Sequence, residues 1–164
     1  MIFALSRRSH EGAHSRVEHE LDDGTPLVWE LLDEAPEEAL VAGDVAFEGA
    51  WIARLDRVDF PPGGIAYRHV HPGPGIRYLL HGELTIDRGD GDPHTHRSGE
   101  AWFEGADDPV LATASTTEDT AFVRVLLLPA EWAGKRTIRY VDRADEDRPR
   151  LQRATVLSEE PLAL

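Results

Sequence analysis

Two histidines separated by one residue, His69 and His71, are the side chains of this sequence best suited to chemistry. Alternate residues of a β-strand face the same side, so both imidazoles would point together, with Tyr67 on the same face. Paired imidazoles at a strand end are a common beginning of a site for a first-row transition metal. An H-x-H pair alone is a weak indication, because histidines also lie in strands for packing or hydrogen bonding.

The residues after the histidine pair predict a β-hairpin that would hold it. Pro72-Gly73-Pro74-Gly75 is a short loop of residues that favour tight turns. The apolar run from Ile76 to His81 is expected to return the chain as a second strand. Gly82 then suits another turn, since glycine adopts backbone conformations that other residues avoid. The histidines are thus predicted to lie on one strand of a sheet.

The spacing of these residues resembles the first sequence motif of the cupin superfamily, G-(x)5-H-x-H-(x)3-E-(x)6-G. Gly63, His69, His71 and Gly82 match its glycines and histidines. Gly75 stands where cupins carry a metal-binding glutamate. The resemblance therefore implies a metal site that lacks one of its usual ligands.

The second cupin motif, which supplies the remaining histidine ligand, is matched less well. The resembling stretch begins at Gly99, and Val110 or Leu111 stands at the histidine position. Two histidines alone hold a metal weakly, because zinc sites use three or four protein ligands. The resemblance implies either a weakly held divalent metal (zinc, iron, manganese or nickel) or no metal. Substitute ligands in the same half of the domain are Glu104, Asp107 and Asp108.

Two further features bear on a site. His94 and His96 form a second H-x-H pair, interpreted as part of a polar strand that points into solvent. Alternation along the Ile76–His81 strand turns Arg77 toward the barrel interior, where an unpaired guanidinium would be costly. Three hypotheses remain open for Arg77. It binds a substrate carboxylate, it pairs with Glu83 or Glu104, or a bulge turns it to solvent.

The fold expected from these patterns is all-β. Short apolar runs separated by Gly, Asp, Pro or Ser clusters, with no helical periodicity between them, favour a sandwich or barrel. The resemblance implies a cupin jelly-roll β-barrel of two antiparallel sheets, with strand-rich N- and C-terminal extensions and at most a short helix. That helix is expected at 35–41. The barrel is placed at 47–129, an N-terminal arm packing on it at 1–46, and a C-terminal extension at 130–164.

The expected pocket opens between the two sheets of the barrel. His69 and His71 are its tentative metal ligands. Its predicted ligand-binding residues are Tyr67, Arg77, Leu79, Trp102, Phe103, Glu104 and Leu111. The leading hypothesis is a small-molecule-binding cupin without an assigned catalytic activity. The alternatives are a metal-dependent oxygenase or isomerase acting on a small carboxylic acid, and a non-enzymatic regulatory or partner-binding domain.

Composition limits the partners. The 164 residues carry a net charge of −14 and no cysteine. This charge repels nucleic acid and anionic membranes, and thiol chemistry is excluded. No apolar run reaches the roughly 20 residues needed to span a bilayer, and the N-terminus lacks the pattern of a signal peptide. We therefore expect a soluble, cytoplasmic protein that binds a small molecule. A homodimer is expected because cupin-like barrels commonly pair and the strand-like arms need cover.

Overall fold

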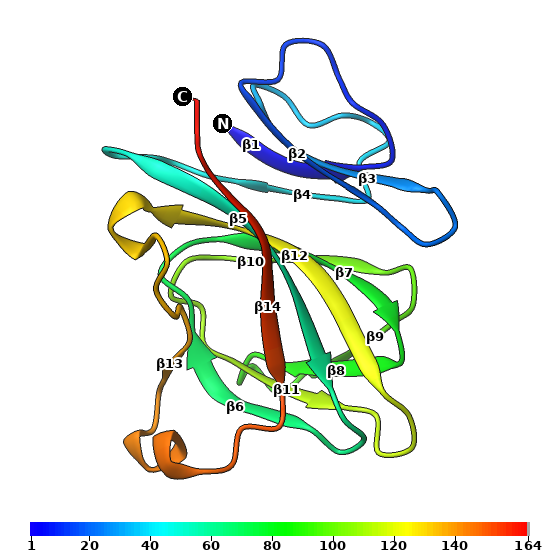
Figure 1. Ribbon diagram of the computed structural model, residues 1–164, viewed down its shortest axis with the longest axis vertical. Helices are drawn as coiled ribbons and strands as arrows, with labels where there is room; N and C mark the ends of the chain where they lie inside the picture. The colour runs from blue at the N-terminus through cyan, green and yellow to red at the C-terminus, as the bar shows by residue number, and fades with distance from the viewer. Residues whose placement is uncertain (164) are drawn as a thin grey trace.

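The computed structural model describes residues 1–163, whose strands form three antiparallel sheets (Figure 1). The N-terminal sheet has the order β2-β3-β1-β4: β1 (Ile2–Ser6), β2 (Ser15–Glu20), β3 (Pro26–Leu32) and β4 (Val41–Asp44). The second has the order β10-β7-β12-β5-β14: β5 (Trp51–Phe60), β7 (Gly75–His81), β10 (Ala101–Glu104), β12 (Thr120–Pro129) and β14 (Arg153–Pro161). The third has the order β13-β6-β11-β8-β9: β6 (Ile65–Val70), β8 (Glu83–Asp87), β9 (His94–Arg97), β11 (Val110–Ala114) and β13 (Arg139–Tyr140). Two short 3-10 helices are η1 (Ala130–Trp132) and η2 (Arg143–Asp147). The expected all-β class is confirmed.

The second and third sheets face each other and enclose one hydrophobic core. Alternation along β11 buries Val110, Ala112 and Ala114 on a single face. These side chains pack with Phe60 of β5 and Phe122 of β12 from the opposite sheet. The two sheets thus form the expected barrel, and its interior is built from the inward residues of both.

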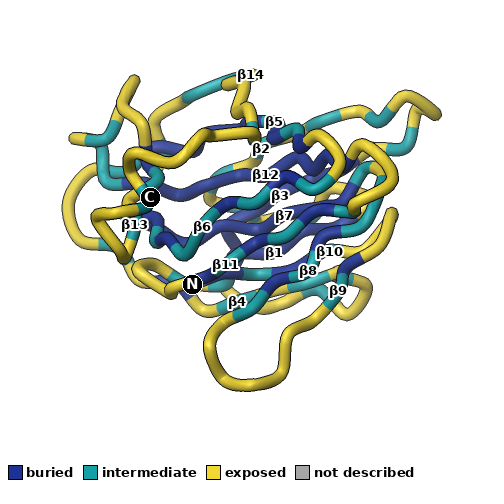
Figure 2. Tube along the Cα trace, turned by 90° about the horizontal axis from the view of Figure 1, so that it is seen from below, coloured by how far each residue is buried: buried dark blue, intermediate teal, exposed yellow. Residues whose placement is uncertain are grey.

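The N-terminal sheet covers the outer face of the second sheet. Trp29 of β3, only 1% exposed, packs in a cluster that includes Val123 and Val125 of β12. Its indole Nε1 donates a hydrogen bond to the carbonyl of Ile76 in β7, at 3.1 Å. Strand β12 is therefore buried on both faces, which explains why its sequence is apolar almost throughout. Figure 2 shows the buried residues running along β3, β7 and β12, with exposed residues in the loops around them.

The two glycines of the first motif lie in turns whose backbone conformation favours glycine. Gly63 has φ 73° and Gly82 has φ 79°, in the left-handed region that favours glycine. A side chain at Gly82 would also meet the backbone of Thr120. These residues end the strands on either side of the histidine pair and so fix its position in the barrel.

The expectation of a short helix at 35–41 is wrong. The structure places a turn there, followed by β4, and β4 pairs with β1 from Ile2↔Asp44 to Leu5↔Val41. The few residues between Pro36 and Gly43 are too short to nucleate a stable helix, whereas a strand gains ladder hydrogen bonds. Among the residues that the structure describes, no helix has the length and apolar character to cross a membrane.

Candidate functional site

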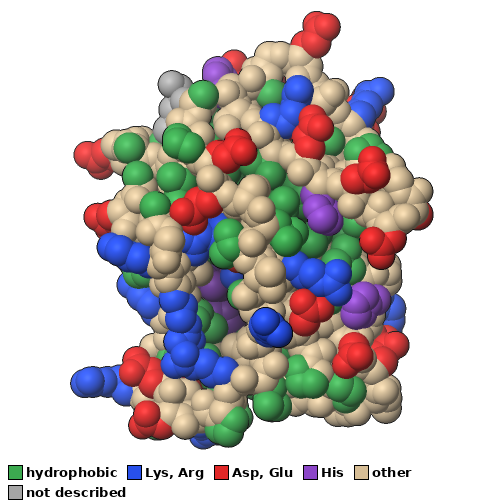
Figure 3. Space-filling view, viewed as in Figure 1, with side chains coloured by type: hydrophobic (Ala, Val, Ile, Leu, Met, Phe, Trp, Pro, Cys, Tyr) green, Lys and Arg blue, Asp and Glu red, His purple; other side chains and the backbone are tan. Residues whose placement is uncertain are grey.

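A cavity of about 560 Å³ lies between the two barrel sheets. Its apolar wall comes from the inward residues of the core, including Phe60, Val110 and Phe122. The polar side chains that line its inner part include Asp56, His69, His71, Arg77, Glu104 and Arg124. The C-terminal segment supplies part of the rim, through residues 134–138 and strand β14. Figure 3 shows a histidine within a hollow of the surface, and basic side chains gather along one edge of that hollow.

The two motif histidines lie side by side in this cavity, with ring centroids 5.1 Å apart. His69 donates from Nδ1 to the carbonyl of Tyr67 at 2.7 Å. The Nε2 atom of His71 lies 3.1 Å from Nη1 of Arg124, and its Nδ1 lies 3.1 Å from Oγ1 of Thr137. Because a guanidinium can only donate, His71 accepts at Nε2 and carries its proton on Nδ1. Both tautomers are thus fixed by their neighbours.

Burial keeps both imidazoles neutral. It lowers the pKa of His69 to about 4, with a smaller contribution from the charges of Arg124 and Arg77. The pKa of His71 is likewise lowered, first by burial and then by the positive charge of Arg124. A neutral imidazole keeps a lone pair, so His69 presents Nε2 as a hydrogen-bond acceptor. At neutral pH the pair is therefore uncharged, and the lone pair of His69 Nε2 stays available while that of His71 accepts from Arg124.

Acid is expected to destabilise the fold through these histidines. Unfolded histidine takes up a proton near pH 6.5, whereas folded His69 stays neutral down to about pH 4. Between these values the unfolded chain binds more protons, so stability present above pH 6.5 is lost as the pH falls. The contribution of His69 is about 3 kcal/mol of unfolding free energy. Urea unfolding between pH 7.5 and pH 4 checks this: His69→Gln should flatten the pH dependence, and the exposed His81→Gln should leave it unchanged. Equal pH dependence in wild type and His69→Gln would contradict the assignment.

Arg77 lies inside the cavity and pairs with Glu104. This contact agrees with the hypothesis of an ion pair and contradicts the one that turns Arg77 to solvent. Its Nη2 atom is 2.7 Å from Oε2 of Glu104, and the two side chains are 2% and 6% exposed. Trp102 donates from Nε1 to the other carboxylate oxygen at 2.8 Å. Burial lowers the pKa of Arg77 to about 10, which leaves it charged at neutral pH. Burial alone would raise the pKa of Glu104, but the Arg77 charge and the Trp102 hydrogen bond hold it below its ordinary value.

A second buried ion pair lies beside the first. Arg124 of β12 donates from Nε and Nη2 to the two oxygens of Asp56 in β5, at 2.7 and 3.1 Å. The side chains are 8% and 3% exposed. This bidentate contact orients the guanidinium so that its Nη1 reaches His71. The cavity therefore holds two guanidinium groups next to two neutral imidazoles.

These residues do not fit the metal that the resemblance implies. The lone pair of His71 Nε2 is engaged by Arg124, and two positive charges lie against the histidine pair. A Cβ at Gly75 would lie 2.6 Å from Cδ2 of Leu126 and 2.8 Å from Nη1 of Arg77. A glutamate therefore has no room at the missing ligand position while Arg77 stays in place.

The structure brings together part of the predicted pocket. His69, His71, Arg77, Trp102 and Glu104 line the cavity. Trp102 and Glu104 alternate along β10 and so share its inner face.

Four predicted pocket residues lie outside the cavity lining. The pairing of β6 with β11 shifts register between Val110 and Ala112, so Ala66 and His69 both face inward and Tyr67 does not. Leu111 alternates with inward neighbours and faces away. Phe103 points to the N-terminal sheet, where it packs in the Trp29 cluster. Leu79 belongs to the barrel core, but the cavity does not reach it.

The sequence interpretation missed Asp56, Arg124 and Thr137. Arg124 carries a signal, since it is the one charge in an apolar strand-like run from Ala121 to Leu128. Such a charge needs a buried partner. Its partner, Asp56, is 68 residues away, and the pair forms only through the register of β5 with β12. Thr137 lies in the C-terminal extension, whose path the sequence leaves open.

Comparison with known proteins identifies a family that part of this chain resembles. The family model described as "Cupin domain" matches residues 56–125. Residues 56–125 are therefore a cupin domain. This match supports the resemblance to the cupin superfamily that the glycine and histidine spacing predicts. No curated protein matches the chain.

Several solved structures are similar to this chain, although their sequence identity to it is low. The polyketide cyclase RemF from Streptomyces resistomycificus is 21% identical with a TM-score of 0.45, over 54% of this chain and 61% of that chain. A cupin-like protein from Thermotoga maritima is 15% identical with a TM-score of 0.46, over 57% of this chain and 69% of that chain. An oxalate oxidase in complex with the substrate analogue glycolate is 21% identical with a TM-score of 0.46, over 59% of this chain and 52% of that chain.

Proposed function

We propose that the cupin barrel binds a small organic anion, held by buried arginines in place of a metal. The observation that carries this proposal is the position of Arg77 and Arg124 against the histidine pair. Guanidinium groups bind carboxylates through paired N–H donors, which a metal-free site needs in order to hold an anion. The metal-dependent oxygenase or isomerase loses support, because the donor set does not suit a cation.

Spare hydrogen-bonding capacity supports an anion. A guanidinium carries five N–H donors, and the contacts of Arg124 with Asp56 and His71 use three of them. Asp56 and Glu104 balance the charges of the two arginines. The rim adds positive charge through Lys135, Arg136 and Arg150, although the chain as a whole carries −14. An incoming anion is therefore attracted at the mouth and meets N–H donors inside.

The remaining polar atoms favour a ligand that also has a hydroxyl or amine. His69 presents its Nε2 lone pair to the cavity. The Oε1 atom of Gln152 is buried at the rim without a hydrogen-bond partner among the described residues. Both atoms accept hydrogen bonds, and a buried acceptor left unpaired costs free energy. A small acid with a donor group and an apolar body would match the cavity.

A thermal-shift and calorimetric screen tests the proposal. Small hydroxy- and amino-carboxylic acids are compared with their primary amides, which keep the shape and lose the charge. We expect an acid to bind and raise the melting temperature, and its amide to bind at least tenfold more weakly. Arg77→Lys keeps the charge but loses the planar fork, so it should also weaken binding at least tenfold. Arg57→Lys is the matched control, because Arg57 is half exposed and pairs with Asp59 away from the cavity. Equal affinity for acid and amide, or an unchanged affinity in folded Arg77→Lys, would overturn the proposal, as would a screen in which no acid binds.

A further inference from the structure

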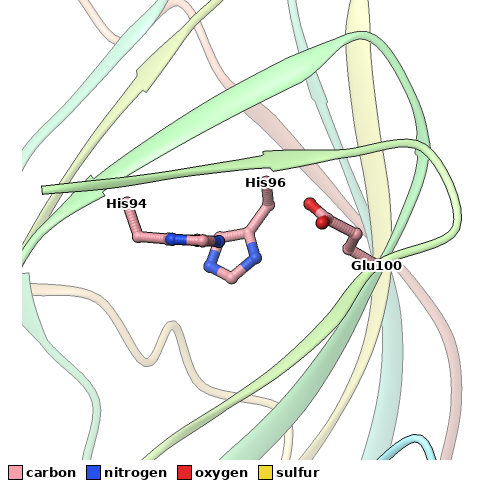
Figure 4. Close-up of side chains that lie close together, drawn as sticks. All are labelled: His94, His96 and Glu100. Atoms are coloured by element: carbon pink, nitrogen blue, oxygen red, sulfur yellow. The ribbon is translucent and has the colours of Figure 1, made fainter.

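A second group of ligand-type side chains lies away from the paired arginines. His94 and His96 are alternate residues of β9, the edge strand of the third sheet, and Glu100 lies in the turn that leads to β10. Figure 4 shows the two imidazole rings next to each other, with the Glu100 carboxylate directed toward His96. The strand pairing explains why the two rings are adjacent. His94 pairs with Ile86 of β8 and His96 pairs with Leu84, so both histidines lie on the same face of the sheet.

The distances suit one metal ion. One ligand atom from each of the three residues lies within 4.8 Å of the other two. The ring centroids of His94 and His96 are 4.4 Å apart. Bonds of about 2.0–2.2 Å to one ion place neighbouring ligand atoms roughly 3–4 Å apart. Small side-chain rotations therefore bring all three onto a common ion.

Two of the three ligands are held in place by the fold. The ring of His96 stacks on Trp102, with centroids 4.3 Å apart and an angle of 16° between the planes. Glu100 is fixed by its backbone, which donates to the carbonyl of Arg97 at 3.0 Å and accepts from the amide of Leu79 at 2.9 Å. Its Oε2 accepts from the Arg97 amide at 2.5 Å, which leaves Oε1 for a ligand.

The nitrogens of His96 are available as ligands. The residue is only 9% exposed, and its ring packs against the indole of Trp102. An imidazole can ligate a metal ion through either of its ring nitrogens.

We propose that His94, His96 and Glu100 form a binding site for a divalent first-row transition metal, zinc above all. Two imidazoles and one carboxylate are a ligand set that zinc accepts, with the remaining position open to water. The site differs from the motif pair, where Arg124 engages the His71 lone pair. Strand β9 belongs to the third sheet and Glu100 leads into β10 of the second. A bound ion would thus join the two barrel sheets at this end.

Titration calorimetry with zinc chloride on protein without a histidine tag tests the site. We expect wild type to bind one zinc per chain, and both His94→Gln and Glu100→Gln to weaken binding at least tenfold. His81→Gln is the matched control, because this histidine is also exposed but lies outside the cluster. Zinc should raise the melting temperature of wild type and His81→Gln, and of His94→Gln much less.

A further variant separates this site from the motif pair. His69→Gln should bind zinc as wild type does, because the proposed ligands are untouched. His94 and Glu100 are exposed, so their variants are expected to fold, and circular dichroism checks this. Absence of zinc binding by wild type at about 100 μM zinc would overturn the proposal. Binding that survives in His94→Gln and disappears in His69→Gln would assign the metal to the barrel pair and would also overturn it.

Discussion

Replacing Asp56 by alanine is expected to lower the free energy of unfolding by about 3–5 kcal/mol. Asp56 accepts two hydrogen bonds from Arg124, and both side chains are almost fully buried. The variant would leave the guanidinium of Arg124 without its counter-charge inside the barrel, and an uncompensated buried charge is costly. Urea unfolding monitored by circular dichroism at pH 7.5 measures the loss.

Asp59, three residues further along β5, provides the matched control. It pairs with Arg57, but these side chains are 45% and 40% exposed. Exposed ion pairs contribute about 0–1 kcal/mol, so Asp59→Ala should have little effect. Adding Arg124→Met to Asp56→Ala should recover part of the stability, because the unpaired charge is removed. An equal cost for the two aspartate variants would contradict a buried ion pair between Arg124 and Asp56.

Trp29→Ala is expected to cost about 3–5 kcal/mol of unfolding free energy. Trp29 is 1% exposed in the cluster that joins the N-terminal sheet to the barrel, and it donates a hydrogen bond to Ile76. Removing the indole would leave a large cavity at this junction. Because β7 and β12 contribute to the same cluster, we expect the whole chain to unfold in a single transition at a lower denaturant concentration.

Trp132 is the control for this prediction, since it is only half buried and packs at the edge of a separate small cluster. Trp132→Ala should cost clearly less than Trp29→Ala. Fluorescence and far-UV circular dichroism should report the same midpoint for each variant. Two transitions, with only one of them moved by Trp29→Ala, would mean that residues 1–46 fold separately from the barrel.

Local patterns were sufficient to predict the barrel and the histidine pair. Gly63, Gly82 and the alternation of His69 with His71 are short-range features, and each follows from backbone geometry within one hairpin. The inward direction of Arg77 also follows from alternation along a single strand. Such features are readable because neighbouring residues determine them.

The rest of the site depends on pairings between distant strands. The shifted register between β6 and β11 reverses the alternation and moves Tyr67 out of the cavity, although nothing in the local sequence marks a bulge. The contact of Arg124 with Asp56 and the position of Thr137 arise from strands far apart in the chain. The homodimer, the cytoplasmic location and the limits of the three segments stay predictions.

The rim of the cavity lies outside the cupin segment, and this has a consequence for selectivity. Arg54 of β5, 4% exposed, donates to the carbonyls of Trp132 and Lys135 and pairs with Glu159 of β14. This one side chain thus binds two segments of the C-terminal extension and holds them at the mouth of the barrel. The buried arginines of the proposed anion site and the C-terminal residues at its rim are thus encoded in separate parts of the chain. A new tail carrying the same anchor points would change which molecules enter while leaving the buried arginines as they are.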